Sequence, residues 1–253
     1  MNKVLHILFF LIATISVAQN DDAFDKANVL YNEGKFQEAI SVYESILETK
    51  VHSAELYFNL ANSYYKQNRV APSIFYYEKA LQLSPNDADI KNNLAFAQNM
   101  TIDAIEKVPE VGFSKLVKSI TNRYSYDTWA MLSVICAVMF VILFLTYYFS
   151  FTTYKKRISF VSSFVALSLM FITLFFAFQK NAADLKNNPA IVFSQESDVK
   201  AEPNLRSESA FQLHEGTKVQ VMDSYNETWT KIKIANGKTG WIASEDIRLL
   251  NDI

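Results

Sequence analysis

Two long uncharged spans in the middle of the chain constrain its fold more than any other feature. Residues 129–150 and 158–179 are almost continuously apolar and hold no acidic or basic side chain. A helix of about 20 residues is long enough to cross a hydrocarbon core of about 30 Å. We therefore predict a hairpin of two transmembrane helices in these two ranges.

The residues around these spans predict the orientation of the hairpin. The short loop 151–157 ends with three adjacent cations, residues 155–157, and such clusters stay on the cytoplasmic side. Residues 1–18 combine a basic start, a short apolar run and small residues before Gln19. This is typical of a secretory signal peptide, and an uncleaved anchor is the alternative. We predict a bacterial inner-membrane protein whose N-terminal and C-terminal domains are periplasmic and whose loop is cytoplasmic.

The charge balance excludes one class of partner. The protein carries 24 basic and 26 acidic side chains, a formal net charge of −2. Acidic groups outnumber basic ones both in residues 19–128 and in residues 189–253. Neither part has the basic surface that displaces counterions from phosphate groups. We expect no nucleic-acid partner.

A repeat of 34 residues organises residues 19–107. Shifting the sequence by 34 positions places Tyr43 on Tyr77 and several small residues on one another. A helical pattern with this period is typical of a helix-turn-helix solenoid. About two and a half copies are present, which is near the minimum for a stable stack. We expect the last helix, running to about Lys107, to cap it.

The second copy, residues 54–87, resembles the tetratricopeptide repeat family, whose repeats pair large with small residues on two antiparallel helices. The matching residues are Tyr57, Leu60, Ala61, Tyr64, Ser73, Tyr77, Ala80 and Pro85. The first copy matches less completely because it lacks the closing proline. The resemblance implies an all-α solenoid over residues 19–107.

The same resemblance implies a binding groove on the concave side of this solenoid. Residues spaced four and then three apart lie on one side of a helix, and in this family they contact a peptide or a partner segment. The residues at these positions are Phe24, Asn28, Tyr31, Phe58, Asn62, Tyr65 and Lys66. An amide side chain both donates and accepts hydrogen bonds, which suits an extended backbone. The alternative, in which the aromatic residues pack between helices and the Asn residues face solvent, is equally open.

Residues 108–128 connect the repeats to the first membrane span. Leu116 and Ile120 fall on one side of a helix, and Lys115 and Lys118 fall outside that stripe. This pattern predicts a short amphipathic helix on the bilayer surface. A linker helix packed on the repeat domain is the alternative.

Residues 189–253, which follow a linker at 180–188, have the pattern of a small all-β domain. Residues 230–234 alternate between polar and apolar with period two, and Asn236 followed by Gly237 is a strong hairpin signal. We predict a barrel of about five to seven short strands.

This domain resembles the bacterial SH3 family in residues 213–219, Trp229 and residues 237–242. In that family the module binds peptides or cell-wall polymer, or docks a partner. Trp229 alternates with the apolar residues of its strand, so we predict Tyr225 and Trp229 as the ligand-binding face. We expect Trp241 to pack in the core.

No catalytic constellation is evident in the sequence. The sole cysteine, Cys136, lies in a predicted membrane span, and His6, His52 and His214 lie in three separate parts of the chain. We find no Gly-rich phosphate loop and no Ser with a His and an acid in one domain. His214 is interpreted as a loop residue. We expect a protein that is not an enzyme and that has no cofactor or metal site.

The order of the parts, signal peptide, tetratricopeptide repeats, transmembrane hairpin and bacterial SH3 module, resembles the BatE family, the repeat-containing members of the Bacteroidetes aerotolerance (Bat) system. The resemblance implies an inner-membrane scaffold beside von Willebrand factor A-type membrane proteins, with a role in aerotolerance or envelope integrity. We predict a non-catalytic adaptor that binds periplasmic or membrane proteins through its repeats and its SH3 module. The alternative is a peptidoglycan-binding anchor or an accessory factor of cell-wall enzymes.

Overall fold

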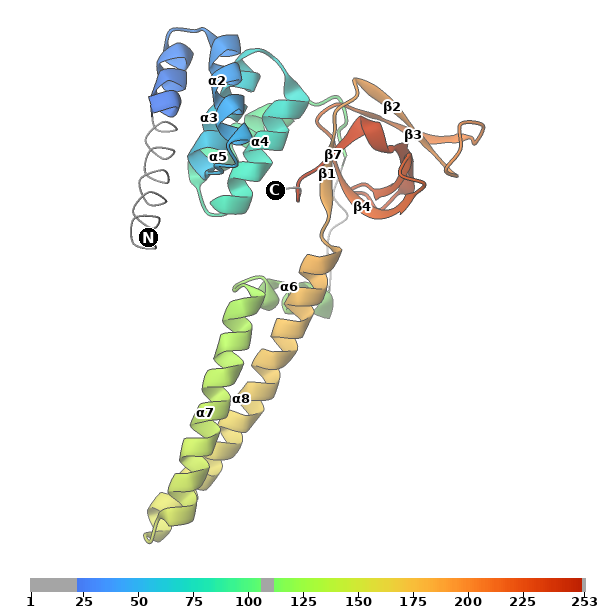
Figure 1. Ribbon diagram of the computed structural model, residues 1–253. Coiled ribbons are helices and arrows are strands. Elements are labelled where there is room, and N and C mark those ends of the chain that lie inside the picture. Colours follow the sequence, from blue (N-terminus) through green and yellow to red (C-terminus); the bar gives the residue numbers. More distant parts are fainter. Residues whose placement is uncertain (1–21, 106–111, 252–253) are drawn as a thin grey trace, which may run out of the picture. The chain divides into compact units, whose positions relative to one another are not determined.

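The computed structural model describes residues 22–105 and 112–251 (Figure 1). The chain divides into two compact units. One unit contains the repeat domain, residues 22–105, together with the C-terminal barrel, residues 189–251. The other unit contains the described part of Val108–Asn188. The predicted signal peptide lies outside the described residues.

Residues 22–98 form the helices of the repeat domain, in which consecutive helices pack against each other (Figure 1). After a first helix over residues 22–32 come α2 (Phe36–Glu48), α3 (Ala54–Lys66), α4 (Val70–Leu83) and α5 (Ala88–Gln98). The Ser53 hydroxyl caps α3 by accepting a hydrogen bond from the backbone N–H of Leu56 at 3.1 Å, and the Asp87 carboxylate caps α5 in the same way. The predicted all-α solenoid is confirmed.

Small residues at the helix crossings and tyrosines between them hold this stack together. The buried small residues are Ala27, Ala39, Ala61, Ser73 and Ala80. They let the helix backbones approach closely, and Tyr43 and Tyr77, which are fully buried, fill the remaining space. The pattern of large and small residues in each 34-residue copy therefore corresponds to the packing.

The C-terminal end of the stack differs from the expectation. The last helix was expected to run to about Lys107, whereas α5 ends at Gln98 and residues 101–105 have no helical structure. The end of a solenoid needs a cover because its last helices would otherwise expose apolar surface. The barrel supplies that cover.

The barrel is a single antiparallel sheet. Its strands are β1 (Pro189–Val192), β2 (Glu196–Lys200), β3 (Ser209–His214), β4 (Lys218–Tyr225), β5 (Trp229–Lys233), β6 (Thr239–Ala243) and β7 (Ile247–Leu249). Seven strands pair in the order β3-β2-β6-β5-β4-β1-β7. The predicted hairpin at Asn236 and Gly237 joins β5 to β6, and Gly237 has the positive φ of 91° that favours glycine there. The predicted small all-β domain is confirmed.

The two faces of β5 and β6 decide where their side chains lie. Ile232 and Ile242 are fully buried inside the barrel. Trp241 precedes Ile242 on the same strand and therefore points to the outer face, where it is half-buried. The expectation that Trp241 packs in the core is wrong, because only one of two successive residues in a strand can face the interior.

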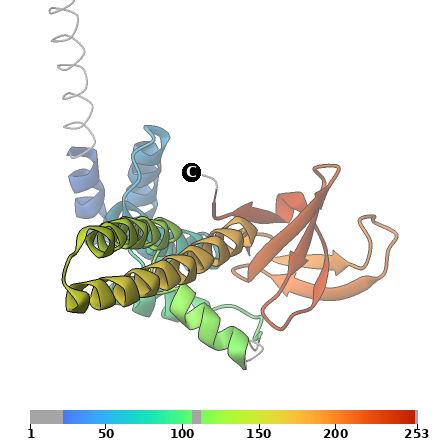
Figure 2. The same ribbon diagram turned by 90° about the horizontal axis from the view of Figure 1, so that it is seen from below.

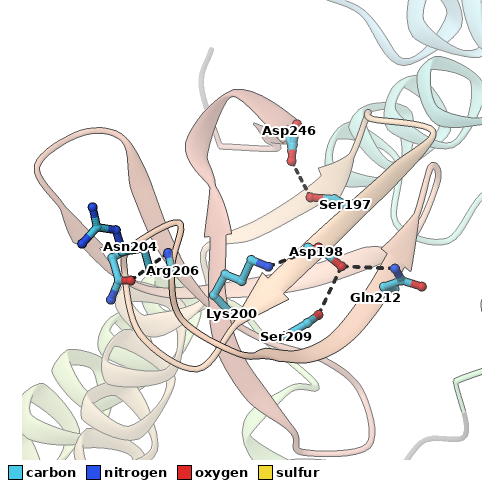
Figure 3. Close-up of polar contacts among 8 residues, drawn as sticks. All are labelled: Ser197, Asp198, Lys200, Asn204, Arg206, Ser209, Gln212 and Asp246. Atoms are coloured by element: carbon cyan, nitrogen blue, oxygen red, sulfur yellow. Dashed lines mark hydrogen bonds and ion pairs between the residues drawn. The ribbon is translucent and has the colours of Figure 1, made fainter.

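Polar contacts organise the strands on one side of the barrel (Figure 3). The Asp198 carboxylate on β2 accepts hydrogen bonds from Ser209 at 3.1 Å and Gln212 at 3.2 Å, and lies 3.2 Å from the Lys200 ammonium. The hydrogen bond from Gln212, with those from Lys200 and Ser209, holds the pKa of Asp198 below its usual range. We interpret this cluster as a brace between β2 and β3.

The barrel and the repeat domain share one hydrophobic cluster. Ile191 and Leu250 of the barrel are fully buried in the same cluster as Ile74 of α4. Gly216 has a positive φ of 84°, and a Cβ built on it would lie 2.9 Å from Ile74 and 3.0 Å from Val70. The backbone of the barrel therefore touches α4 at a point where no side chain fits. We call this contact region the joint.

Polar contacts complete the joint around one carboxylate. Asp103, in the segment after α5, accepts hydrogen bonds from the backbone N–H of His214 at 2.7 Å and from the Thr217 hydroxyl at 2.6 Å. The Nδ1 atom of His214 lies 2.8 Å from the second carboxylate oxygen. Burial alone would raise the pKa of Asp103, but these hydrogen bonds outweigh it and lower the pKa. His214 is thus the last residue of β3 and a joint contact, not a loop residue.

The second unit is built from α6 (Phe113–Thr121), α7 (Tyr126–Phe149) and α8 (Thr153–Lys186). In both α7 and α8 the length and apolar composition suffice to cross a membrane. They pack along each other through small side chains of α8, of which Ser159, Ser163 and Ala166 are buried. The predicted transmembrane hairpin is confirmed as a pair of packed apolar helices.

The helices of this hairpin are longer than the apolar spans. Only residues 150–152 separate α7 from α8, so most of the predicted loop 151–157 forms the first turn of α8. At its other end α8 continues to Lys186, through most of the predicted linker 180–188. Polar residues extend both ends because a helix satisfies its own backbone hydrogen bonds whether or not lipid surrounds it.

Candidate functional site

The repeat domain contains a hollow of about 200 Å³ on the side formed by the first helix of each repeat. Its lining residues are Tyr31, Asn62, Tyr65, Lys66, Tyr77, Asn93 and Phe96. The lining combines amide and hydroxyl groups, aromatic rings and one cation. Such a surface offers hydrogen bonds and apolar contact at once, which is the usual composition of a ligand site.

Four of the seven predicted groove residues line this hollow, namely Tyr31, Asn62, Tyr65 and Lys66. The other three have different contacts. The ring of Phe24 lies 5.9 Å from that of Tyr43, and the ring of Phe58 lies 6.0 Å from that of Tyr77, each in a tilted arrangement. These two phenylalanines pack between helices.

A hydrogen-bonded triad occurs twice along the stack, at the same positions of successive repeats. In the first copy the Oδ1 atom of Asn28 accepts hydrogen bonds from the Tyr43 hydroxyl at 2.6 Å and from the Asn59 amide at 3.0 Å. The carbonyl oxygen of Asn28 is therefore occupied within the stack. It fixes the helix of residues 22–32 to α2 and α3.

The second copy repeats these contacts 34 residues later. The Oδ1 atom of Asn62 accepts hydrogen bonds from the Tyr77 hydroxyl at 2.5 Å and from the Asn93 amide at 2.9 Å. Burial raises the pKa of Tyr77, as it does that of Tyr43, so both hydroxyls stay protonated and act as donors at physiological pH. The side-chain carbonyl oxygens of Asn28 and Asn62 are thus both bonded within the stack. They are directed neither to solvent nor to a ligand.

Three residues of the hollow lie outside the predicted groove. Tyr77 belongs to the repeat motif, and Asn93 and Phe96 belong to the third copy. A further shift by 34 positions would have found them, because Asn59 falls on Asn93 and Asn62 falls on Phe96. The side chain of Phe96 is 60% exposed. It places an exposed ring where the first two copies have the triad asparagine.

A second candidate surface lies on the outer face of the barrel. Tyr225 of β4 is directly opposite Trp229 of β5, and Lys231 of β5 is directly opposite Trp241 of β6. The rings of Tyr225 and Trp241 are 6.3 Å apart, and the Lys231 ammonium lies 5.7 Å from the centre of the Trp241 ring. The predicted residues Tyr225 and Trp229 therefore share this face with Trp241 and Lys231. We call these four residues the aromatic face.

Within the described residues, no group of three or more His, Cys, Asp or Glu side chains is placed to hold a metal ion. Cys136 is half-buried in α7 as a free thiol. The two candidate surfaces offer hydrogen-bonding groups, aromatic rings and single cations.

Comparison with known protein families agrees with this architecture. Residues 54–87 match the tetratricopeptide repeat, and residues 197–248 match the bacterial SH3 domain. The match to the repeat covers α3 and α4, and the match to the SH3 domain covers most of the barrel. No curated protein matches the chain. The two families indicate a protein that binds other proteins and that has a domain type associated with cell-wall binding.

Proposed function

We propose that this protein is a non-catalytic scaffold of the bacterial inner membrane that holds a segment of a protein partner in the hollow of its repeats. The observation that carries the proposal is the hollow of about 200 Å³, which joins the amides of Asn62 and Asn93 to the exposed ring of Phe96. A partner segment gains both hydrogen bonds and apolar burial there.

The contacts within the stack narrow the kind of segment that fits. The carbonyl oxygen of Asn62 is occupied by Tyr77 and Asn93, so its Nδ2 group is the end that serves a ligand. Lys66 adds a positive charge to the lining. The Asn62 amide donor and the Lys66 cation therefore suit an extended segment whose backbone carbonyls and acidic side chains accept hydrogen bonds from them.

The residues around the membrane hairpin support a periplasmic setting for this site. Positive residues gather at 155–157, between the two spans, and such residues favour the cytoplasmic side. The repeat domain and the barrel then share the periplasm, where a cleaved signal peptide would deliver the first of them. The order of the parts supports a role beside von Willebrand factor A-type membrane proteins of the Bat system in aerotolerance or envelope stress.

Co-purification of the tagged full-length protein from native membranes in mild detergent tests this proposal. We expect a retained membrane protein to be lost in a Tyr65→Ala, Lys66→Glu variant. The matched control is Lys91→Glu, which makes the same charge change on an exposed position of α5 outside the hollow. Unchanged retention by a folded double variant would contradict the groove, and equal loss in the control would indicate a nonspecific charge effect.

The aromatic face favours a second candidate function, a peptidoglycan-binding anchor. Tyr225, Trp229 and Trp241 present adjacent rings, and aromatic rings stack on sugars and peptide bonds alike. We expect binding of purified peptidoglycan by the full-length protein to fall in Trp241→Ala and to persist in Phe96→Ala, which alters only the hollow. The reverse pattern, or no binding by the unmodified protein, would exclude this function.

A further inference from the structure

Helix α6 lies across the end of the transmembrane hairpin where α7 begins and α8 ends (Figures 1 and 2). Two contacts fix it there. The indole N–H of Trp129 in α7 donates a hydrogen bond to the backbone carbonyl of Thr121 at 3.0 Å, and the Lys180 ammonium of α8 lies 3.4 Å from the side-chain oxygen of Asn122. The position of α6 is therefore set by the hairpin itself.

One side of α6 faces the hairpin and a neighbouring side carries exposed apolar residues. Thr121 is only 5% exposed and Val117 is half-buried. Leu116 is 56% exposed and Ile120 is 37% exposed. At about 100° per residue, the side chains of Leu116 and Ile120 lie roughly 90° around the helix from the side that faces the hairpin.

The positive charges of α6 lie on the remaining side. Lys118 and Lys115 are exposed and fall about 80° and about 140° from the hairpin side, in the opposite direction to Leu116 and Ile120. Arg123 lies two residues after the end of α6, and no acidic residue occurs from residue 112 to residue 126. A helix lying flat beside a membrane-spanning hairpin needs these same three sides, facing the hairpin, the acyl chains and the water.

We propose that α6 lies in the membrane interface and binds anionic phospholipid headgroups through Lys115, Lys118 and Arg123, with Leu116 and Ile120 inserted among the acyl chains. The helices α7 and α8 beside it expose large apolar side chains, among them Met131, Val134 and Phe175, which need an apolar cover. We therefore assign lipid as the occupant of the apolar side of α6 as well. Tyr124, between α6 and α7, and Tyr126, the first residue of α7, are both exposed. Amphipathic rings of this kind gather at the membrane interface. This surface is independent of the repeat hollow and of the aromatic face.

The depth of α6 can be measured in the full-length protein reconstituted in vesicles of phosphatidylglycerol and phosphatidylcholine. A nitroxide is attached at Ile120→Cys or at Lys115→Cys, each in a Cys136→Ser background. We expect the label at residue 120 to collide more often with oxygen than with a water-soluble nickel chelate, and the label at residue 115 to show the reverse. Access of the chelate to residue 120 would place the helix in water, and access of neither reagent would place it against protein; both results overturn the proposal.

A second measurement tests the class of lipid. A fluorophore at Leu116→Cys is quenched by brominated phosphatidylglycerol or by brominated phosphatidylcholine, which reports the local lipid composition. We expect the anionic lipid to be enriched near the fluorophore. This enrichment should fall about fivefold for each cation removed in the double variant Lys115→Gln, Lys118→Gln. It should also be weaker at high salt, which screens the charges. The control, Lys155→Gln, Lys156→Gln, removes the same charge at the other end of the hairpin and should leave the enrichment unchanged. Equal quenching by both lipids in the unmodified protein would overturn the assignment to anionic headgroups.

Discussion

The repeat domain is held together by two unlike kinds of contact: those between its own repeats and those with the barrel. Between repeats, the triad of a tyrosine and two asparagines recurs with the 34-residue period, at Asn28 and again at Asn62. At the joint, a glycine backbone and one carboxylate make contacts that occur once. A repeated contact can be altered in one copy while the other copy persists, whereas the joint has no second copy.

The joint makes the barrel part of the repeat domain's packing. Instead of a separate module on a linker, the barrel covers the end of the solenoid with Ile191 and Leu250, in the place of a further helix. Stability of the repeats and of the barrel should therefore be coupled, and damage at the joint should lower both.

Gly216→Ala should cause the largest loss in the free energy of unfolding. The added methyl group would lie 2.9 Å from both Ile74 and Thr101, and the residue also has a positive φ of 84°. Overpacking together with an unfavourable backbone conformation costs about 2–4 kcal/mol. Denaturant unfolding of the full-length protein in detergent measures the change.

The matched control for this substitution is Gly237→Ala. Its φ of 91° imposes a similar backbone strain, but no atom lies within 4 Å of the added methyl group. We expect a loss of about 1 kcal/mol. If both variants lose the same amount, strain alone explains the result and the close approach at the joint contributes nothing.

Asp103→Ala should cause the second-largest loss of stability. It leaves the Thr217 hydroxyl and the backbone N–H of His214 without their acceptor in a region shielded from water. We expect a total cost of about 1–3 kcal/mol, because water can enter the space that the carboxylate leaves and bind one of the two donors. Asp198→Ala is the control, because Asp198 braces two strands on the exposed side of the barrel. A loss in the control equal to that in Asp103→Ala would contradict a special role of the joint.

The contribution of Asp103 should also depend on pH. Its pKa in the folded protein is lowered, so its stabilising effect is fully present above the ordinary carboxyl pKa of about 3.9 and is lost as the pH falls through the lower folded value. We expect unmodified protein and Asp103→Asn to differ in stability at pH 6, and the difference to begin to shrink only as the pH falls below about 4. A difference that stays constant from pH 6 to pH 3 would show that the carboxylate charge is not involved.

Much of this architecture is local and could be predicted from the sequence. The repeat period, the caps at Ser53 and Asp87, the apolar spans and the hairpin at Gly237 each depend on residues near one another in the chain. The groove was predicted in part for the same reason. Its third-copy residues Asn93 and Phe96 carry the same periodic signal.

The joint could not be predicted in this way. Asp103 and His214 are 111 positions apart and belong to no shared period, so nothing in either local pattern indicates their contact. The placement of Trp241 failed for a different reason. Its size favoured the core, but the strand alternation shared with Ile232 and Ile242 decides which face is buried.

The repeated triad should give the smallest loss of stability, and it best distinguishes the contacts between repeats from those at the joint. Tyr43→Phe and Tyr77→Phe each remove one hydroxyl and leave the asparagine oxygen with its second donor, Asn59 or Asn93. We expect each to cost about 1 kcal/mol, the usual net value of one hydrogen bond, and the losses to add in the double variant because the two triads share no residue. Tyr77 also lines the hollow, so only its variant should weaken partner retention. Unequal stability losses in the two single variants would mean that the joint, which is nearer in the chain to Tyr77, has made the second copy different from the first.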